Sequence, residues 1–368
     1  MRSYLSTYKI TLETKSPLYI GSGKTMGKKE YIYNKAKKEV VVPDIMKMYQ
    51  GLRKKGLAEA YERFLLDSRE KDLYMWLRNH NVDYEEYRKW KQYSYDSSDI
   101  VFDKQARDVS LFVKDPYGNP YVPGSSLKGV FRTIFCVDEL LYNDRLKKQT
   151  QDTIQSQLRN SRPGRAFLQK EIKEIEADVF NTIEIEKIPK RNAVHDNMKG
   201  IIISDSKPLK VEDLTLCQKI DVDTRGNKTR MPILRECIKP GTIIQFDLTV
   251  DDSINQYNNE SILDAVNNFL EGYHLFLDKY ESYNKEKDII YLGGSVGFAS
   301  KTIIYGLFPE REAVKAISTI FDKTLPYKMK QQHHHERDLR LGVSPHIKKC
   351  TEYAGKEYEF GKCKIWIE

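Results

Sequence analysis

The sequence predicts an α+β fold, with helices packed on one face of small antiparallel sheets. Apolar residues alternate with polar ones over residues 8–12 and 244–250, which is the pattern of a strand with one buried face. Over residues 262–280 they recur at helical spacing and form one apolar stripe. Because regular strand–helix–strand repeats are lacking, we expect ferredoxin-like domains of the RNA-recognition-motif (RRM) type, and 368 residues suffice for two.

The N-terminal third is predicted to combine short strands with a helical insertion. A strand over residues 8–12 ends at Ser16-Pro17, and a second short strand is expected at 18–20. Large apolar residues at helical spacing among many charges predict a helical insertion over residues 44–90. The polar segment 93–99 is expected to be a mobile connection.

A turn at residues 116–120 precedes the most clearly marked helix start. Behind Pro123-Gly124, apolar residues recur at i, i+3, i+4, i+7 and i+8 from Leu127. Ser125 or Ser126 is well placed to act as the N-cap of this helix.

The remaining chain is predicted to hold a second insertion and further short strands. The strongly charged segment 141–200 is expected to be helical or loop-like, with little intrinsic order. Strands are predicted at 201–203, at 244–250 behind the turn Pro240-Gly241, and at 289–292 and 303–308. The expected domains are an N-terminal RRM-like domain, 1–205, with helical insertions at about 45–115 and 140–195, and a C-terminal RRM-like domain, 206–368, with a glycine-rich loop, 293–302.

Composition narrows the class of protein. Lysine and arginine (61) outnumber aspartate and glutamate (53), giving a net charge of +8 that suits an anionic partner without identifying it. Five widely spaced cysteines without a C-x-x-C pair argue against a disulfide framework or a zinc ribbon, so a reducing, cytoplasmic location is expected. The N-terminal segment has neither signal-peptide nor transit-peptide character, and no apolar stretch approaches the roughly 18 residues that span a bilayer. We therefore expect a soluble protein with no membrane partner.

Three glycine- or serine-rich segments are the candidate anion-binding sites: GSGKT (21–25), PGSSLKG (123–129) and GGSVGFASKT (293–302). Glycine lets backbone N–H groups converge on a phosphate, and a nearby lysine supplies the counter-charge. Each segment alone is equally consistent with an ordinary turn, but three together favour phosphate binding. Nucleotide hydrolysis is disfavoured, because a P-loop ending at Gly23-Lys24-Thr25 requires glycine at the position of Leu18.

Basic residues extend the candidate interface. Lys128 and Arg132 are four residues apart on the predicted helix and should project from one exposed side, where they form either a phosphate grip or a solvated basic edge. The 24 tyrosines offer stacking surfaces for single-stranded RNA, although most are expected to be core or surface residues. The predicted RNA-binding residues are Gly21, Ser22, Gly23, Lys24, Lys28, Lys29, Ser125, Ser126, Lys128, Arg132, Arg162, Arg165, Gly293, Gly294, Ser295, Gly297 and Lys301.

Neither a catalytic site nor a metal site is predicted, and no cofactor is expected. Residues 333–336 and Asp338 offer metal donors, but contiguous histidines cannot all face one ion, so an exposed polar loop is favoured. His195 could serve as a general acid or base in RNA cleavage, yet no second catalytic group lies near it in the sequence. A solvated loop histidine is the favoured interpretation.

At these segments the chain resembles the repeat-associated mysterious protein (RAMP) superfamily of CRISPR-associated RNA-binding proteins. The order of the segments also looks like that of the family of the fifth subunit of the type III-A Csm complex, whereas residues 51–115 and 140–195 carry little of this signal. The resembling stretches are LETKSPLYIGSG (12–23), VPDIMKMYQ (42–50), YVPGSSLKGVFRT (121–133), MKGIIISDSKPL (198–209), RECIKPGT (235–242), YLGGSVGFASKT (291–302) and GVSPHIKKCTEYAGKEYEFGKCKI (342–365).

The resemblance implies two RRM-like domains and a subunit that binds the 3′ region of the crRNA. It also implies contact with the terminal RAMP backbone subunit and other Csm subunits, proximity to target RNA, and a part in crRNA 3′-end maturation with host nucleases as possible partners. Backbone subunits of this complex cleave target RNA with an aspartate in the loop after the first strand. Here that loop, GSGKTMGKKE, has only Glu30 as a carboxylate.

A non-catalytic crRNA-binding subunit that caps the filament is therefore the leading hypothesis. The first alternative is a RAMP-type guide-processing endoribonuclease that uses His195 or Glu30. The second alternative is a protein scaffold that ends the filament without touching RNA.

Overall fold

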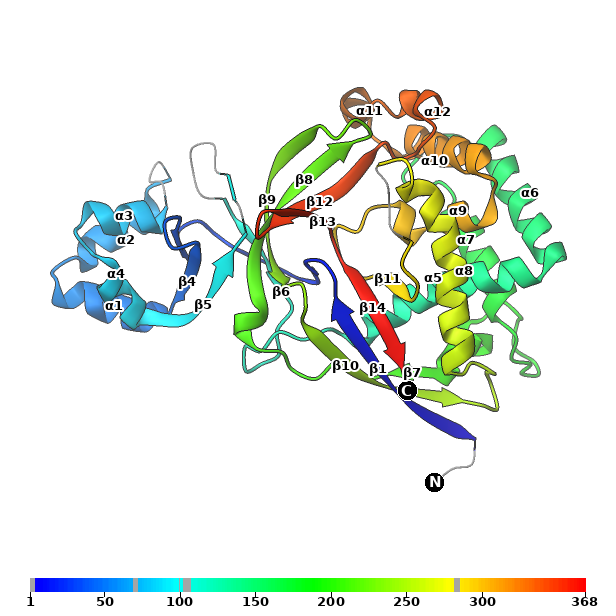
Figure 1. The fold of residues 1–368 in the computed structure, drawn as a ribbon, viewed down its shortest axis with the longest axis horizontal. Coiled ribbons are helices and arrows are strands. Elements are labelled where there is room, and N and C mark those ends of the chain that lie inside the picture. The colour runs from blue at the N-terminus through cyan, green and yellow to red at the C-terminus, as the bar shows by residue number, and fades with distance from the viewer. Residues whose placement is uncertain (1–3, 69–71, 99, 102–106, 281–284) are drawn as a thin grey trace.

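The computed structural model describes residues 4–68, 72–98, 100–101, 107–280 and 285–368. Within these residues the chain forms two sheets, a body of helices on one side, and a small helical lobe at the far end (Figure 1). The predicted α+β class is confirmed. No helix in the described ranges is both long enough and apolar enough to cross a membrane.

The first sheet is five-stranded and antiparallel throughout. Its buried face shows the alternation expected from the sequence, with Ile10 and Leu12 of one central strand facing Phe246 and Ile244 of its neighbour. Its strands, in spatial order, are β11 (Ile289–Tyr291), β14 (Lys362–Ile367), β1 (Leu5–Thr14), β10 (Ile243–Asp251) and β7 (Ile201–Ile203).

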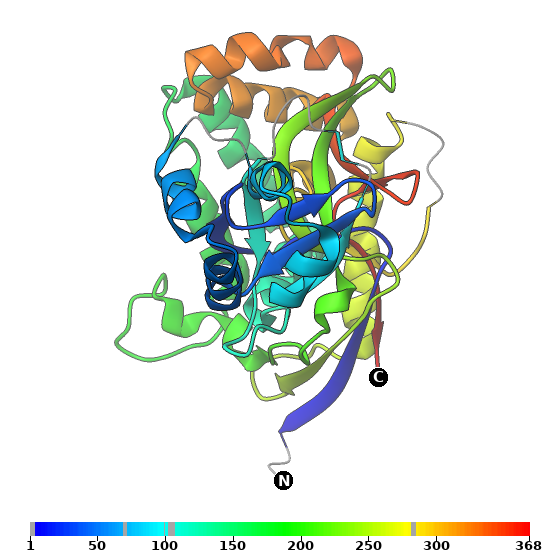
Figure 2. The ribbon, with the colours of Figure 1, turned by 90° about the vertical axis from the view of Figure 1, so that its left-hand side faces the viewer.

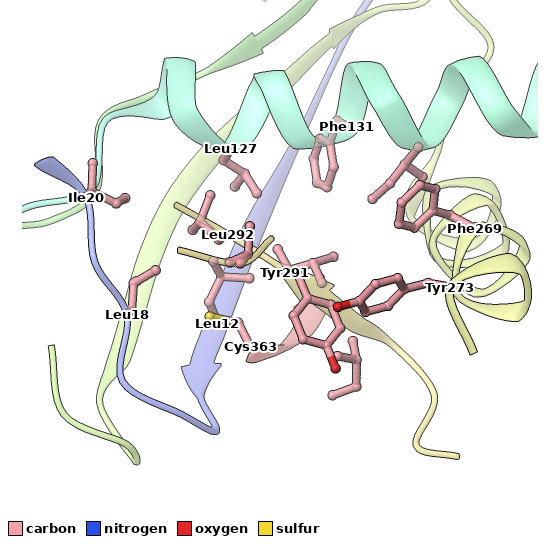
Figure 3. Packing of buried hydrophobic residues seen from close by; sticks show 14 of the residues in the cluster. Leu12, Leu18, Ile20, Leu127, Phe131, Phe269, Tyr273, Tyr291, Leu292 and Cys363 are labelled. Atoms are coloured by element: carbon pink, nitrogen blue, oxygen red, sulfur yellow. The ribbon is translucent and has the colours of Figure 1, made fainter. Parts of the chain in front are cut away.

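Two long helices, α5 (Gly124–Tyr142) and α8 (Asn259–Leu277), cover this face. Figure 3 shows Leu127 and Phe131 pointing down from α5, and Phe269 and Tyr273 reaching in from α8, above Leu12 of β1. All five side chains are at most 7 % exposed, so this contact forms the main hydrophobic core. The predicted helices at 127–135 and 262–280 are thus confirmed.

The second sheet is nine-stranded and mixed, because β5 pairs with β8, and β6 with β9, in parallel. Its main path runs β2 (Gly21–Met26), β6 (Val109–Phe112), β9 (Lys228–Ile238), β8 (Leu214–Asp223), β5 (Lys91–Ser97), β4 (Glu39–Pro43) and β3 (Ile32–Asn34); β12 (Ile347–Tyr353) pairs with β8, and β13 (Lys356–Glu359) with β12.

The helical lobe (Figures 1 and 2) confirms the insertion predicted over residues 44–90. It has a small core of its own, with Phe64 and Trp76 in ring contact. Asp44 caps its first helix by accepting hydrogen bonds from the backbone N–H groups of Met46 and Lys47. The lobe contains α1 (Ile45–Lys54), α2 (Ala58–Leu66), α3 (Leu73–Asn79), α4 (Tyr84–Tyr87) and the 3₁₀ helix η1 (Arg88–Trp90).

The remaining helices surround the core on the side of α5 and α8. The charged segment 141–200 contains two of them, as its expected helical character allows. They are α6 (Asp144–Asn160), α7 (Gln169–Phe180), α9 (Ile304–Leu307), α10 (Glu310–Thr324), α11 (Tyr327–His333) and α12 (Asp338–Leu341), with 3₁₀ turns η2 (Ala193–His195), η3 (Asn197–Gly200), η4 (Val211–Asp213), η5 (Ala299–Lys301) and η6 (His335–Arg337).

Two predictions in the N-terminal third are wrong, one of a strand and one of a mobile connection. Residues 18–20 form only an isolated bridge from Leu18 to Ile238, and the strand β2 begins one residue later. The segment predicted as a mobile connection is largely strand β5, with Tyr95 and Ser97 buried; residue 99 lies outside the described residues. The buried side chains of β5 are a tyrosine and a serine, so the strand lacks the aliphatic residues at alternate positions that would have marked it.

The strand predicted at 303–308 is the short helix α9 instead. The helix α9 packs closely on α8 at two glycines. A Cβ on Gly272 of α8 would lie only 2.7 Å from the Gly306 Cα. The N-cap prediction is also wrong, since α5 begins at Gly124, whose N–H donates to Asp205 Oδ1 at 2.9 Å.

Both sheets combine strands from the two predicted domains, since β1 pairs with β10 and β5 pairs with β8. Strand pairing does not test whether residues 1–205 and 206–368 fold independently, so the boundary between the two domains stays a prediction.

Candidate nucleic-acid interface

The three candidate segments, more than 270 residues apart at their extremes, meet around one cavity of about 380 Å³. Gly21 comes from the first segment, Ser125 and Ser126 from the second, and Gly293 with Gly294 from the third. Lys301 lies on the same wall and brings a positive charge to it. The fold thus joins parts of all three predicted phosphate-binding segments.

The start of α5 reaches this cavity because Gly124 permits a very close backbone approach. A Cβ at this position would lie 2.3 Å from the carbonyl oxygens of both Ile203 and Ser204, at the end of β7. Glycine therefore places the first turn of α5, with the Ser125 and Ser126 side chains, directly over the five-stranded sheet. The Gly124 N–H already donates to Asp205 Oδ1 and the Ser126 N–H to the Pro123 carbonyl, so the serine hydroxyls are the donors that this turn offers to the cavity.

The position of the glycine-rich loop is fixed by contacts with Tyr19. Gly294 donates its N–H to the Tyr19 carbonyl at 2.7 Å, and a Cβ on Gly293 would lie 2.3 Å from the same oxygen. Gly293 has a φ of +87°, a conformation that side-chain-bearing residues rarely adopt. Ser295, also at positive φ, has a buried Oγ without a hydrogen-bond partner. The loop shape therefore depends on its glycines.

Two lysines near the cavity have no ion pair among the described residues. Burial lowers the pKa of Lys301, and the charge of Arg235 lowers it further. Burial also lowers the pKa of Lys128, with Asp196 acting to raise it and Arg132 to lower it. Lys128 is half-buried and Lys301 is exposed, and neither cation has a fixed counter-ion among the described residues.

The expected phosphate grip by Arg132 is wrong in its premise of a free, exposed charge. Arg132 Nε lies 2.9 Å from Glu176 Oε2, and Nη1 lies 2.8 Å from Asp196 Oδ2. The guanidinium also covers the Phe180 ring, 4.4 Å from its centroid. Arg132 therefore links α5 to α7 and to the segment before β7 through ion pairs, and its charge is already neutralised.

The first segment is a strand rather than the expected loop. Ser22, Gly23 and Lys24 belong to β2, and Ser22 Oγ donates to the Leu111 carbonyl. Lys29 Nζ donates to the carbonyls of Phe64 and Asp67, at 2.5 and 2.8 Å, and so caps the end of α2. Lys24 is exposed and Lys28 is partly exposed, so their RNA contacts stay predictions.

A second, more apolar cavity of about 570 Å³ adjoins the first, since Gly129, Thr133 and Lys301 line both. Arg165 lies on its rim, whereas Arg162 is exposed and lines neither cavity. Gly297 lines a separate cavity of about 190 Å³. The predicted residues that converge on the first cavity are therefore Gly21, Ser125, Ser126, Gly293, Gly294 and Lys301.

Neither candidate catalytic residue lines the cavities described above. His195 is buried rather than a solvated loop residue, with Nδ1 2.6 Å from the Ile183 carbonyl oxygen and Nε2 without a partner. Glu30 is exposed, and its Oε2 accepts a hydrogen bond from the Gly27 N–H.

A buried carboxylate organises part of the histidine-rich region, which corrects the expectation of an exposed polar loop. Asp338 is fully buried, and its two oxygens accept hydrogen bonds from Ser344 Oγ and from ring nitrogens of His335 and His346. One carboxylate oxygen of Asp338 and one ring nitrogen of each histidine, the atoms that could bind a metal ion, lie within 4.8 Å of one another. His346 lies outside the contiguous run, so local sequence could not identify it as the third member.

A buried ion pair supports the sheet next to the cavity. Glu236 of β9 has no solvent exposure, and its Oε2 lies 2.5 Å from Lys114 Nζ and 3.1 Å from the Phe112 N–H nitrogen. Its Oε1 accepts from the Tyr93 hydroxyl at 3.2 Å. The carboxylate thus joins β9 to β6, to β5 and to the segment after β6.

The sequence matches the RAMP superfamily over residues 11–342. A protein of Mycobacterium tuberculosis named "CRISPR system Cms protein Csm5" is 26 % identical over 400 aligned positions, which cover 100 % of this chain and 99 % of the relative. The protein of the same name from Streptococcus thermophilus is 30 % identical over 319 positions, covering 82 % of each chain.

Two solved structures share the fold. A chain in a cryo-EM structure of a Csm–crRNA–target RNA ternary complex of a type III-A CRISPR-Cas system superposes with a TM-score of 0.65 at 19 % identity, over 98 % of this chain and 100 % of that one. The crystal structure of T. onnurineus Csm5 gives a TM-score of 0.63 at 17 % identity, over 96 % and 99 %. From these matches, the chain belongs to the RAMP superfamily and, within it, to the Csm5 family.

Proposed function

We propose that this protein is a non-catalytic RNA-binding subunit of a type III-A Csm interference complex, in which it holds the 3′ region of the crRNA. It ends the backbone filament by contacting the terminal RAMP backbone subunit, lies among the other Csm subunits near the target RNA, and assists 3′-end maturation with host nucleases. The observation that carries the proposal is the convergence of α5 and the glycine-rich loop on one cavity, together with a lysine that has no ion pair among the described residues.

The chemistry of the cavity suits a phosphodiester backbone. The start of α5 supplies two serine hydroxyls, and Lys301 supplies charge. These donors recognise phosphate without regard to base identity, as a subunit that must accept many guide sequences requires. Lys128 lies in the same first turns of α5 and extends the positive surface.

The residues that line the cavity favour binding over cleavage. Among them are glycines, serines, apolar residues and Lys301, but no histidine, aspartate or glutamate. Metal-independent RNA cleavage needs a positioned general acid and base, and neither His195 nor Glu30 reaches this cavity. The endoribonuclease alternative therefore has no geometric support from the described residues.

The test is co-expression of the whole complex with its guide, comparing wild type with the double variant Lys128→Glu/Lys301→Glu. The matched control is Arg311→Glu/Lys315→Glu, which makes the same charge change on the exposed side of α10. We expect the first variant, and not the control, to lose the subunit from the particle or to give altered guide 3′ ends on sequencing. An intact particle with unchanged guides would favour the scaffold alternative instead.

A further inference from the structure

Arg235, in the middle of β9, is a cation without a counter-ion. Its guanidinium lies over the Tyr19 ring, 4.6 Å from the ring centroid. Nε and Nη1 are buried and make no hydrogen bond, and no ion pair of Arg235 occurs in the described part of the chain. Nη2 is not among the buried atoms, so it is the nitrogen that reaches solvent. A charge that is half desolvated and unpaired is costly, and an anion at Nη2 would offset that cost.

The neighbouring acid cannot serve as this anion. Glu236 follows Arg235 in the strand and therefore points to the opposite face of the sheet, where Lys114 already neutralises it at 2.5 Å. The cross-strand neighbours of Arg235 are Cys217 on β8 and Ser110 on β6, both neutral. Local protein groups thus leave the guanidinium without a carboxylate.

Tyr19 connects Arg235 to the wall of the 380 Å³ cavity. Its ring and hydroxyl pack against Gly21 and Gly294, where added Cβ atoms would lie 2.6 Å from Oη and 2.8 Å from Cδ1. Lys301, on the same cavity wall, is close enough to Arg235 for the guanidinium charge to lower its pKa, after the larger effect of burial. Two like charges are therefore held near each other, and neither has an ion pair in the part of the chain that the structure describes.

We infer that Arg235 and Lys301 together hold one phosphate group of the RNA backbone, at a subsite beside the glycine-rich loop, with Tyr19 fixing the guanidinium. The inference rests on the proposed RNA binding and adds a residue that no sequence pattern indicated. Guanidinium and ammonium groups both form short, charge-assisted hydrogen bonds to phosphate oxygens. A phosphate bound between the two cations would offset their mutual repulsion.

The first experiment uses the full-length chain and inorganic phosphate. Tm is compared in sodium phosphate and in sodium chloride at equal ionic strength, for wild type, Arg235→Gln, Lys301→Gln and the charge-matched control Arg311→Gln. We expect phosphate to raise the Tm of wild type and of the control, because a ligand of the folded state stabilises it. The increment should vanish in the other two variants; an increment that persists in them overturns the subsite.

The second experiment measures binding of a single-stranded RNA with the guide's 3′ sequence by fluorescence anisotropy over a range of salt. Each single variant should bind roughly 10-fold more weakly, as expected for a lost charge-assisted contact, and should reduce the salt slope by about 0.7. Because both cations contact one phosphate, the double variant should lose much less than the roughly 100-fold product of the single effects.

Controls separate the subsite from the proposed function and from misfolding. Arg235→Lys keeps the positive charge but lacks the planar guanidinium, so it should bind RNA with an affinity between those of wild type and Arg235→Gln. Its Tm, compared with that of wild type, shows whether the variant is folded. Unchanged RNA affinity in folded Arg235→Gln, with weakened binding in Lys128→Glu, would overturn the subsite and leave the proposed function standing. If wild type binds no RNA in this assay, both the subsite and the proposed function are overturned.

Discussion

Replacing Glu236 by glutamine would test how a buried ion pair supports the sheet beside the cavity. The change keeps the shape of the side chain and one oxygen that can accept from the Phe112 N–H, but it removes the charge that faces Lys114. The Lys114 side chain is only 16 % exposed, so water cannot replace the lost counter-charge fully. Breaking a buried pair costs about 3–5 kcal/mol, and the residual exposure of Lys114 places our expectation at about 3 kcal/mol.

The assay is urea unfolding of a double-mutant cycle with Lys114→Met. Each single variant leaves one buried charge uncompensated, whereas the double variant leaves none, so we expect it to be at least about 2 kcal/mol more stable than additivity predicts. For a chain of this size, Glu236→Gln should lower Tm by roughly 4 °C. Strictly additive effects, or a loss below about 1 kcal/mol in Glu236→Gln, would refute the reasoning.

Two further predictions concern the loop and the buried carboxylate. Gly293→Ala should cost at least about 2 kcal/mol in urea unfolding, because its Cβ would meet the Tyr19 carbonyl; Gly226→Ala, also at positive φ but in open space, should cost about 1 kcal/mol. Burial acts to raise the pKa of Asp338, but hydrogen bonds from His335 and from its other two donors outweigh burial and lower it. Asp338 should therefore stabilise the protein above the ordinary aspartate pKa of about 3.9, and less as pH falls through its lowered value.

Each of these two predictions has a result that contradicts it. Equal losses in Gly293→Ala and Gly226→Ala would show that the close approach to Tyr19 carries no cost. For Asp338, urea unfolding between pH 6 and pH 3 should show a weaker acid dependence in Asp338→Asn than in wild type. If the free energy of unfolding changes equally with pH in the two proteins, then folding does not lower the pKa of Asp338.

Local pattern predicted the elements whose own residues contain the signal. The strand β1, the strand β10 and the helix α8 each show full alternation or a full apolar stripe, and the start of α5 has its Pro-Gly marker. The strand β5 was missed because its inward positions are tyrosine and serine. The four-residue helix α9 was missed because so short an apolar run has no distinguishable period.

The candidate site was predicted in its loops but not in its long-range partners. Glycine and serine content alone indicated the segments that line the cavity. The partners of Arg132 lie 44 and 64 residues away in the sequence, and the pairing of Gly124 with Asp205 spans 81 residues. Which charges are neutralised, and which, like Arg235, are left unpaired, depends on these tertiary contacts and not on spacing along the chain.

The position of β14 in the five-stranded sheet sets an order for the assembly of the protein during synthesis. This strand, red in Figure 1, lies between β11 and β1, and Gly361 just before it exchanges backbone hydrogen bonds with Pro17 and Leu292. While residues 361–367 are still inside the ribosome, the segments that flank Tyr19 and the glycine-rich loop lack this shared partner. The cavity can therefore take its final shape only after those residues emerge and β14 joins the sheet.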